Sequence, residues 1–142
     1  MSQDNEAIGR SRGGYSTKIH LAVDARGQPI KFLLTAGQVH DITQAEHLFE
    51  GTGAECVVGD RGYDSNAFVS VVTDRGAKVV IPSRSNIKTP RPLNKTIYKE
   101  RNRVERCINR LKQWRRVATR YEKTARNFSS FVACAAAMIL LK

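Results

Sequence analysis

The chain has 142 residues, of which 24 are Lys or Arg and 13 are Asp or Glu, so its formal net charge at pH 7 is +11. A hydrophobic fraction of 41% is typical of a folded protein and argues against a disordered basic tail. The longest apolar run, 131–141, is too short to cross a bilayer, and the polar start leads us to expect no secretion signal.

The positive charge is concentrated in the second part of the chain. Residues 1–80 carry 8 basic and 10 acidic side chains, a balance of −2, whereas residues 81–142 carry 16 and 3, a balance of +13. A one-sided basic surface is the electrostatic footprint of a polyanion, usually a nucleic acid. The alternative is a solvated basic face with no partner.

Cysteine and histidine usage indicates an intracellular protein without a zinc site. Cys56, Cys107 and Cys134 are odd in number, widely spaced and set among apolar neighbours, so we expect buried, reduced thiols in a reducing cytosol. The three histidines do not have the spacing of zinc ligands and are expected to serve strands or caps: His20, His40 and His47.

The N-terminal half begins with a predicted β-hairpin. Residues 1–14 contain three glycines among polar residues and are expected to be a flexible segment. Three apolar residues then follow a period of two, as in a half-buried strand: Ile19, Leu21 and Val23. Turn residues at 24–27, with Asp24 as a turn former, lead into a second strand at 30–34.

The next predicted element is a helix near 42–50. Asp41 and Thr43 are candidate N-caps, and Glu46 would complete a capping box with Thr43. The remaining expected segments are strand 55–59, helix 66–73, strand 77–81, a Pro-containing basic loop at 82–96, a long helix at 97–121, and an apolar, buried closing helix at 128–141. This order predicts one mixed α/β layered domain over residues 15–142.

Two places carry residues suited to chemistry. Asp60 follows a predicted buried strand, where α/β folds often place active sites, although Asp before Gly is also common as a loop cap. On the long helix, four residues fall within one stripe, at phases of about 20°, −40°, 0° and −20°: Tyr98, Arg101, Glu105 and Lys112. The plainer alternative is an Arg101–Glu105 salt bridge, worth about 0.2–0.5 kcal/mol.

These motifs resemble those of a known family. The spacing Tyr98-x2-Arg101-x3-Glu105-x6-Lys112 is similar to the signature around the last acid of DDE transposases from bacterial insertion sequences, in the insertion-sequence-four/five-like group. Asp60-Arg61-Gly62-Tyr63 resembles the motif of their second acid. The segment Gly9-Arg10-Ser11-Arg12-Gly13-Gly14, with Thr17-Lys18-Ile19-His20 after it, resembles the stretch before their second strand.

The resemblance implies a ribonuclease-H-like mixed sheet flanked by helices, in which three carboxylates hold two Mg²⁺ ions, with Mn²⁺ as a substitute. Such a site cleaves DNA at transposon ends and joins it to a target by the two-metal chemistry of phosphodiesters. Asp60 and Glu105 would be catalytic metal ligands, and Tyr98, Arg101 and Lys112 would contact DNA.

The sequence departs from the family at the first acid. That Asp belongs to a first strand upstream of the Gly-Arg-Ser-Arg segment, where this chain has only residues 1–8. We therefore expect the C-terminal part of a catalytic domain, lacking its first strand and incomplete unless an upstream segment supplies the acid. Its expected partners are DNA and either that upstream segment or a second copy in a homo-oligomer, in the bacterial cytoplasm at the nucleoid. The alternatives are a non-catalytic DNA-binding fragment or remnant and, less well matched to the motifs, an RNA-binding structural protein.

Overall fold

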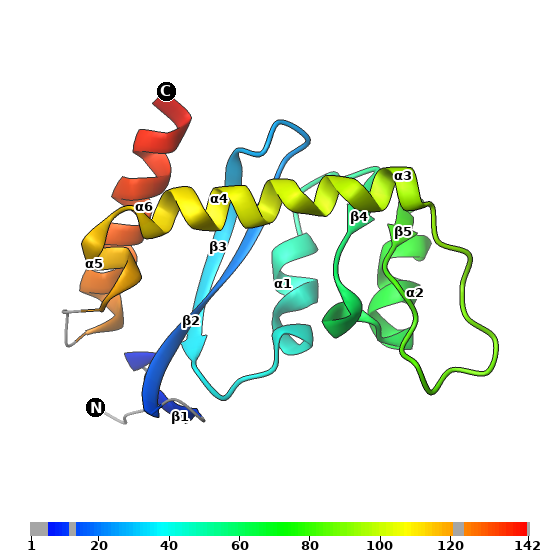
Figure 1. Cartoon of the computed structure of the whole chain (residues 1–142), viewed down its shortest axis with the longest axis horizontal. Coiled ribbons are helices and arrows are strands. Elements are labelled where there is room, and N and C mark those ends of the chain that lie inside the picture. Colours follow the sequence, from blue (N-terminus) through cyan, green and yellow to red (C-terminus); the bar gives the residue numbers. More distant parts are fainter. Residues whose placement is uncertain (1–5, 12–13, 121–123, 142) are drawn as a thin grey trace. The chain divides into compact units, whose positions relative to one another are not determined.

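The computed structural model describes residues 6–11, 14–120 and 124–141. The chain divides into two compact units (Figure 1). The terminal unit contains Met1–Val39 and Arg103–Lys142, and the central unit contains His40–Asn102. The mixed α/β class is confirmed, because each unit combines a small sheet with helices. The ribonuclease-H-like sheet and its missing first strand stay predictions.

The terminal unit contains a three-stranded antiparallel sheet in the order β1-β2-β3. The predicted hairpin is confirmed as β2 (Gly14–Val23) and β3 (Pro29–Ala36). Asp24 is the turn residue expected, since its Oδ1 accepts hydrogen bonds from the N–H groups of Arg26 and Gln28 at 2.9 and 3.0 Å. Gly27 adopts φ = 80°, which glycine reaches without strain.

Strand β1 (Gly9–Ser11) lies in the segment that was expected to be flexible. It pairs with the start of β2, where Gly9 is opposite Ser16 and Ser11 is opposite Gly14. The polar, glycine-containing sequence gives no alternation to read, and the pairing partner is what makes this segment a strand. Residues 1–5 and 12–13 of the predicted flexible segment lie outside the described residues.

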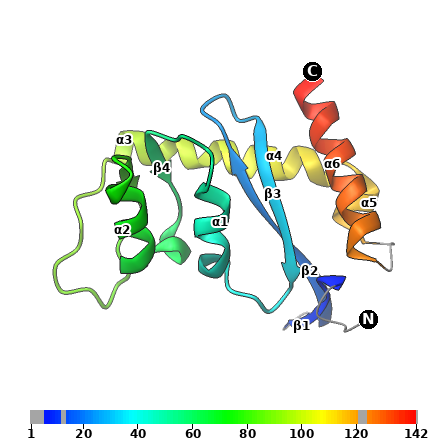
Figure 2. The same ribbon diagram turned by 180° about the vertical axis from the view of Figure 1, so that it is seen from behind.

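The helices of the terminal unit are α4 (Asn102–Lys112, of which Asn102 belongs to the central unit), α5 (Arg115–Ala118) and α6 (Ala125–Leu141). Their apolar sides form one core with the hairpin, and α6 packs beside β3 (Figure 2). The residues buried in this core are Leu21, Cys107, Leu111, Val117, Phe128, Val132, Ala135 and Ile139.

The long helix expected at 97–121 is wrong in its extent. Helical structure starts with α3 (Lys95–Tyr98), passes through the 3₁₀ turn η4 (Lys99–Arg101) and continues as α4. Helix α4 ends with tightened i→i−3 hydrogen bonds, and Trp114 then adopts an extended conformation. This break lets Val117 of α5 join the core, which a straight helix pattern does not predict.

The apolar sequence of α6 suggested a helix buried on all sides, but the structure buries only one of its faces. Its buried residues are spaced by four, three and four positions and form one face: Phe128, Val132, Ala135 and Ile139. Met138, Leu140 and Leu141 are exposed. Apolar composition therefore predicted the helix but not which of its sides is covered.

The central unit is built around two parallel strands, β4 (Cys56–Val58) and β5 (Lys78–Val80), joined through α2 (Asn66–Asp74). All three elements agree with the sequence prediction. Helix α2 begins after Ser65, whose Oγ accepts a hydrogen bond from the Phe68 N–H. Its buried face packs with α1 (Ala45–Phe49), and the rings of Phe49 and Phe68 meet edge to face at 6.4 Å.

The capping box predicted for the helix near 42–50 is not formed. The helical stretch begins with the 3₁₀ turn η2 (Asp41–Gln44), so the N-cap positions are His40 and Gln44, and neither side chain makes a capping hydrogen bond. Thr43 instead donates its hydroxyl to the His40 carbonyl at 2.6 Å. A 3₁₀ turn shifts the register by which a capping box is recognised.

The remaining sequence expectations concern the cysteines, Trp114 and membrane-spanning segments. Cys107 is buried as predicted, Cys56 is half-buried and Cys134 is exposed, so the expectation of a buried thiol is wrong for Cys134. Trp114, which falls within the long helix predicted at 97–121, has an exposed fraction of 41% and so is not a core residue. Among the described residues, no helix combines the length and the apolar character needed to cross a membrane.

Candidate active site

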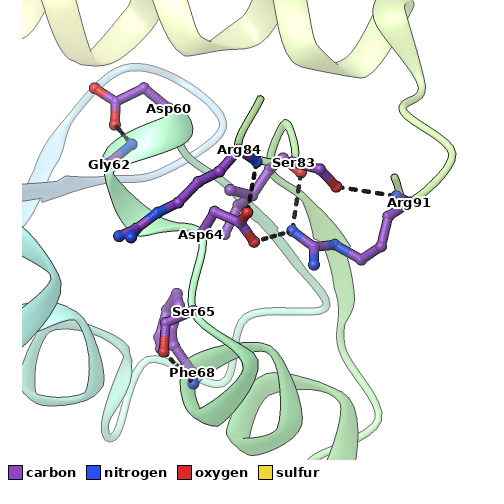
Figure 3. A network of polar contacts seen from close by, with 9 residues as sticks. Asp60, Gly62, Asp64, Ser65, Phe68, Ser83, Arg84 and Arg91 are labelled. Carbon is purple, nitrogen blue, oxygen red and sulfur yellow. Dashed lines mark hydrogen bonds and ion pairs between the residues drawn. The ribbon is translucent and has the colours of Figure 1, made fainter. Parts of the chain in front are cut away.

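Asp60 lies just beyond the end of β4. The Gly59 N–H still bonds to the Val80 carbonyl, at 3.2 Å, and the chain then turns into η3 (Arg61–Tyr63). Asp60 caps this turn, because its Oδ1 accepts a hydrogen bond from the Gly62 N–H at 2.9 Å (Figure 3). Its other oxygen, Oδ2, accepts no hydrogen bond from any described residue, and the side chain is exposed. The loop-cap reading is therefore confirmed, and it leaves one oxygen available for a ligand.

Tyr63 packs next to the backbone that leads to Asp60. A Cβ on Gly59 would lie in ordinary van der Waals contact, 3.4 Å from Tyr63 Cδ2 and 3.6 Å from Ile81 Cγ1, so the Tyr63 side chain packs close to the backbone at Gly59. Burial, followed by the charges of Asp41 and Asp60, raises the pKa of Tyr63 to about 12. The phenol is thus a neutral hydrogen-bonding group at neutral pH, and the carboxylates of Asp41 and Asp60 are close enough to act on it.

Asp64 is the functional-site candidate that the sequence reasoning missed. It follows η3 directly and is buried, with a side chain only 4% exposed. Its Oδ1 forms an ion pair with Arg91, and its Oδ2 accepts the Arg84 backbone N–H at 2.7 Å (Figure 3). Burial raises the pKa of the Asp64 carboxyl, but the hydrogen bonds and charges of Arg91 and Arg84 outweigh burial and hold the pKa below its usual value of 3.8.

A sequence signal for this pair exists in hindsight. Arg91 stands between Pro90 and Pro92, which restrict the backbone on both sides of it. A cation on such a stiffened loop is suited to a fixed partner rather than to solvent. Arg91 belongs to the basic loop predicted at 82–96, and the structure pairs it with Asp64.

Tyr98 and Arg101 meet in the central unit. Tyr98 ends α3, whose start is capped by Asn94, the side-chain oxygen of which accepts the N–H groups of Thr96 and Ile97, both at 3.1 Å. The Arg101 guanidinium carbon lies 5.6 Å from the centroid of the Tyr98 ring, a cation–π arrangement. These two members of the predicted stripe are therefore in contact.

Glu105 and Lys112 lie on α4 in the terminal unit. Glu105 is in the first turn and Lys112 is the last residue, and both side chains are exposed. Seven residues make nearly two turns, so Glu105 and Lys112 lie on the same face of α4. This face is exposed, whereas Cys107 and Leu111 on the same helix are buried. Asp60 belongs to the central unit and Glu105 to the terminal unit, so the convergence of their carboxylates stays a prediction.

A metal ion needs several donor side chains gathered at one place. In residues 6–11, 14–120 and 124–141, no three His, Cys, Asp or Glu side chains form a group able to hold a metal ion. His20 is buried on β2, where its Nε2 is 2.5 Å from the Thr35 hydroxyl, as expected for a strand histidine. The carboxylates of Asp60 and Glu105 are the hard oxygen donors that Mg²⁺ prefers.

Residues 3–140 match the family described as "Transposase DDE domain". The chain belongs to this family. It is 38% identical over 132 residues to a Brucella ovis protein named "Putative transposase for insertion sequence element IS6501", covering 89% of this chain and 99% of that protein. It is 30% identical over 142 residues to a Burkholderia cepacia protein named "Putative transposase for insertion sequence element IS402", covering 92% of this chain and 64% of that protein.

No solved structure matches the chain. The resemblance drawn from the motifs at Asp60 and Glu105 is thus confirmed at the level of the family: a DDE-type insertion-sequence transposase. The roles of the individual residues are a matter of proposal.

Proposed function

We propose that this chain is the C-terminal part of a transposase catalytic domain that cleaves a DNA strand at the end of an insertion sequence and transfers it to target DNA. Membership of the transposase family supports the reaction class. The observation that carries the site is Asp60, an exposed carboxylate at the end of a parallel strand pair, with one oxygen fixed by Gly62 and the other open. Such strand ends are where α/β folds place their active sites.

Asp60 and Glu105 are proposed as the metal ligands. Their carboxylate oxygens fit two Mg²⁺ ions in the complete site, with Mn²⁺ as a substitute. When bound, such ions activate an attacking oxygen and neutralise charge on the leaving oxygen. Gly62 holds Asp60 Oδ1, so the rotamer of this carboxylate is set before any ligand arrives. The neutral phenol of Tyr63 adds no competing charge.

Tyr98, Arg101 and Lys112 are proposed to bind DNA. The Tyr98 ring orients the Arg101 guanidinium, and Lys112 is exposed on the Glu105 face of α4. Residues 81–142 carry a balance of +13, so affinity for duplex DNA should fall steeply with salt. Charge reversal by Arg101→Glu or Lys112→Glu should weaken binding more than Arg26→Glu in the hairpin turn. Equal losses at all three would indicate diffuse attraction instead of a site.

The first acid is proposed to come from an upstream transposase segment. Asp24 does not qualify, because its Oδ1 is committed to the hairpin turn. The second candidate function is a DNA-binding transposase fragment that is never catalytic. The specific observation favouring it is that no group of three His, Cys, Asp or Glu side chains able to hold a metal ion occurs among the described residues.

The experiment uses a labelled duplex carrying the cognate transposon end, with Mg²⁺ or Mn²⁺. The purified chain alone should neither nick nor join it. Adding the upstream segment should restore cleavage, and Asp60→Asn or Glu105→Gln should then abolish it with DNA binding retained. Asp74→Asn, an exposed acid at the end of α2, is the matched control and should leave cleavage unchanged.

Three results would contradict the proposal. Cleavage by the chain alone would remove the need for an outside acid, and its loss in Asp24→Asn would make Asp24 that acid. Persistent cleavage in Asp60→Asn would remove the site. Paramagnetic Mn²⁺ in NMR should broaden the amide signals around both Asp60 and Glu105 when the complete site is assembled, and broadening at one alone would show that they do not share metal.

A further inference from the structure

The loop between β5 and α3 is held by a single buried carboxylate. Asp64 accepts the backbone N–H of Arg84 at one side of the loop and the guanidinium of Arg91 at the other. The Arg91 backbone N–H donates to the Ser83 hydroxyl at 2.9 Å, which ties the two sides of the loop together. A charge buried this deeply is tolerated only when it is paired and hydrogen-bonded, so the attachment is strong.

The same attachment holds the backbone at Arg84, from which the side chain extends. In Figure 3 the Arg84 side chain extends away from the Arg91 guanidinium, on the other side of the Asp64 carboxylate. The Ile87 N–H bonds to the Arg84 carbonyl at 3.1 Å and closes a turn behind it. The Arg84 side chain is exposed and makes no hydrogen bond within the described residues.

Arg84 lines a cavity of about 370 Å³ within the central unit. Asn66 and Asn86 line it as well, and their side-chain amides make no hydrogen bonds among the residues that the structure describes. Ile42 and Ile87 supply apolar wall. Asp64 also lines the cavity, but its carboxylate is paired with Arg91. The cavity therefore offers one cation and two neutral amide donors, a set suited to a phosphate group.

The charge of the loop supports a polyanion as the ligand. Residues 82–94 contain three basic and no acidic side chains. Arg91 forms the ion pair with Asp64, and the Arg84 charge acts on Asp64 without a hydrogen bond from its side chain, so the Arg84 guanidinium keeps its donors for a further partner. The loop starts directly after β5, the strand that pairs with the β4 strand leading to Asp60, so it belongs to the same unit as that acid.

We propose that Arg84, positioned by the Asp64–Arg91 ion pair, binds a backbone phosphate of the DNA strand, with Asn66 and Asn86 as additional donors. The inference rests on the proposed function and deepens it. Arg84 is the DNA-binding residue, and Asp64 and Arg91 are positioning residues that act through it. None of the three belongs to the set of four residues in the predicted stripe.

The first test replaces the cation itself. Binding of the full chain to a fluorescent duplex of mixed sequence is measured between about 50 and 200 mM salt, over which one phosphate contact accounts for roughly a 3.5-fold loss of affinity. Arg84→Gln should weaken binding at low salt and reduce the slope of log affinity against log salt by about 0.9. Lys78→Gln, an exposed cation on β5, is the matched control and should leave the slope unchanged.

The second test separates positioning from bulk charge. Asp64→Asn removes a negative charge, so diffuse electrostatics predicts tighter DNA binding, as expected for the control Asp74→Asn. The positioning proposal predicts the opposite: weaker binding, and little further loss when Arg84→Gln is added. Thermal melting of each variant shows whether it is folded, and the Arg84→Gln result decides the matter if Asp64→Asn does not fold.

The outcomes distinguish this inference from the proposed function. If the wild-type chain fails to bind DNA at all, both are wrong. If it binds DNA and Arg84→Gln behaves like Lys78→Gln, the phosphate site is overturned while the proposed function stands. If Arg84→Gln reduces the salt slope and Asp64→Asn tightens binding, Arg84 binds phosphate but the positioning role of Asp64 is wrong.

Discussion

The Asp64–Arg91 ion pair offers the sharpest test of the central unit. Arg91→Ala removes the guanidinium and leaves the Asp64 carboxylate buried, with the Arg84 backbone N–H as its remaining hydrogen-bond donor. The charge of Arg84, which also lowers the Asp64 pKa, remains, but among the described residues Arg84 donates only its backbone N–H to the carboxylate. The variant should therefore be destabilised by desolvation of Asp64 and not by lost packing.

The magnitude follows from the exposure of the two partners. Breaking a fully buried pair from one side costs about 3–5 kcal/mol. The Asp64 side chain is 4% exposed, but Arg91 is 30% exposed, so water already hydrates part of the guanidinium. We expect a loss of about 2–3 kcal/mol in the free energy of unfolding at neutral pH. In an Asp64→Asn background the same substitution should cost only about 1 kcal/mol, because no buried charge is left.

The pH dependence of the Asp64 contribution to stability should have opposite signs in the wild type and in Arg91→Ala. In the wild type the Asp64 pKa is held below 3.8, so its contribution to stability is complete well above that pH and is lost as the pH falls through the folded-state pKa. Without Arg91, burial dominates and raises the Asp64 pKa above its unfolded value. The variant then gains stability relative to the wild type as the pH falls, because the neutral carboxyl is favoured when folded.

Urea unfolding followed by far-ultraviolet circular dichroism, from about pH 7 to pH 4, measures both effects. The difference between wild type and Arg91→Ala should shrink steadily toward low pH. Lys88→Ala, an exposed cation on the same loop, should change stability by less than about 0.5 kcal/mol at every pH. A pH-independent difference, or one below about 1 kcal/mol at neutral pH, would refute the reasoning.

Three further predictions follow from burial. Since the Tyr63 pKa is raised to about 12 against 10.0 when unfolded, stability should fall between those pH values, and Tyr63→Phe should remove that loss in alkaline unfolding and one late step from the tyrosinate absorbance. A thiol reagent should label exposed Cys134 rapidly and buried Cys107, whose pKa burial raises, only on unfolding; equal rates would contradict the structure. Val132→Ala should cost about 2 kcal/mol in thermal or urea unfolding, and exposed Leu140→Ala less than about 0.5.

Local patterns predicted the elements whose causes are local. The alternation of Ile19, Leu21 and Val23, together with the turn at Asp24 and Gly27, contains everything that a hairpin needs, and the hairpin is observed. The apolar runs at β4 and β5 similarly predicted two strands, but their predicted burial is wrong, because β4 is half-buried and only Val80 of β5 is buried. The motif at Asp60 identified a loop cap at the end of a strand, and with the Glu105 motif it indicated the family.

Tertiary contacts decided what these patterns leave open. The break at Trp114 and the exposed side of α6 depend on where the core needs Val117 and which face of α6 meets the hairpin, and helical periodicity does not contain that information. The strand β1 exists because β2 is there to pair with it. In each case the deciding energy comes from burial or pairing with a segment distant in the sequence.

Asp64 shows the division most clearly. Its sequence context is that of an ordinary turn residue, and Arg91 stands 27 positions further along the chain. The sequence does not show whether an Asp side chain will be exposed to water or buried. Only a buried carboxylate requires a cation at contact distance, because desolvation makes an unpaired charge costly. The sequence by itself determined the secondary elements of this unit and the identity of its exposed acid, Asp60. Only the folded chain decided that Asp64 takes Arg91 as its partner and leaves Arg84 for a ligand.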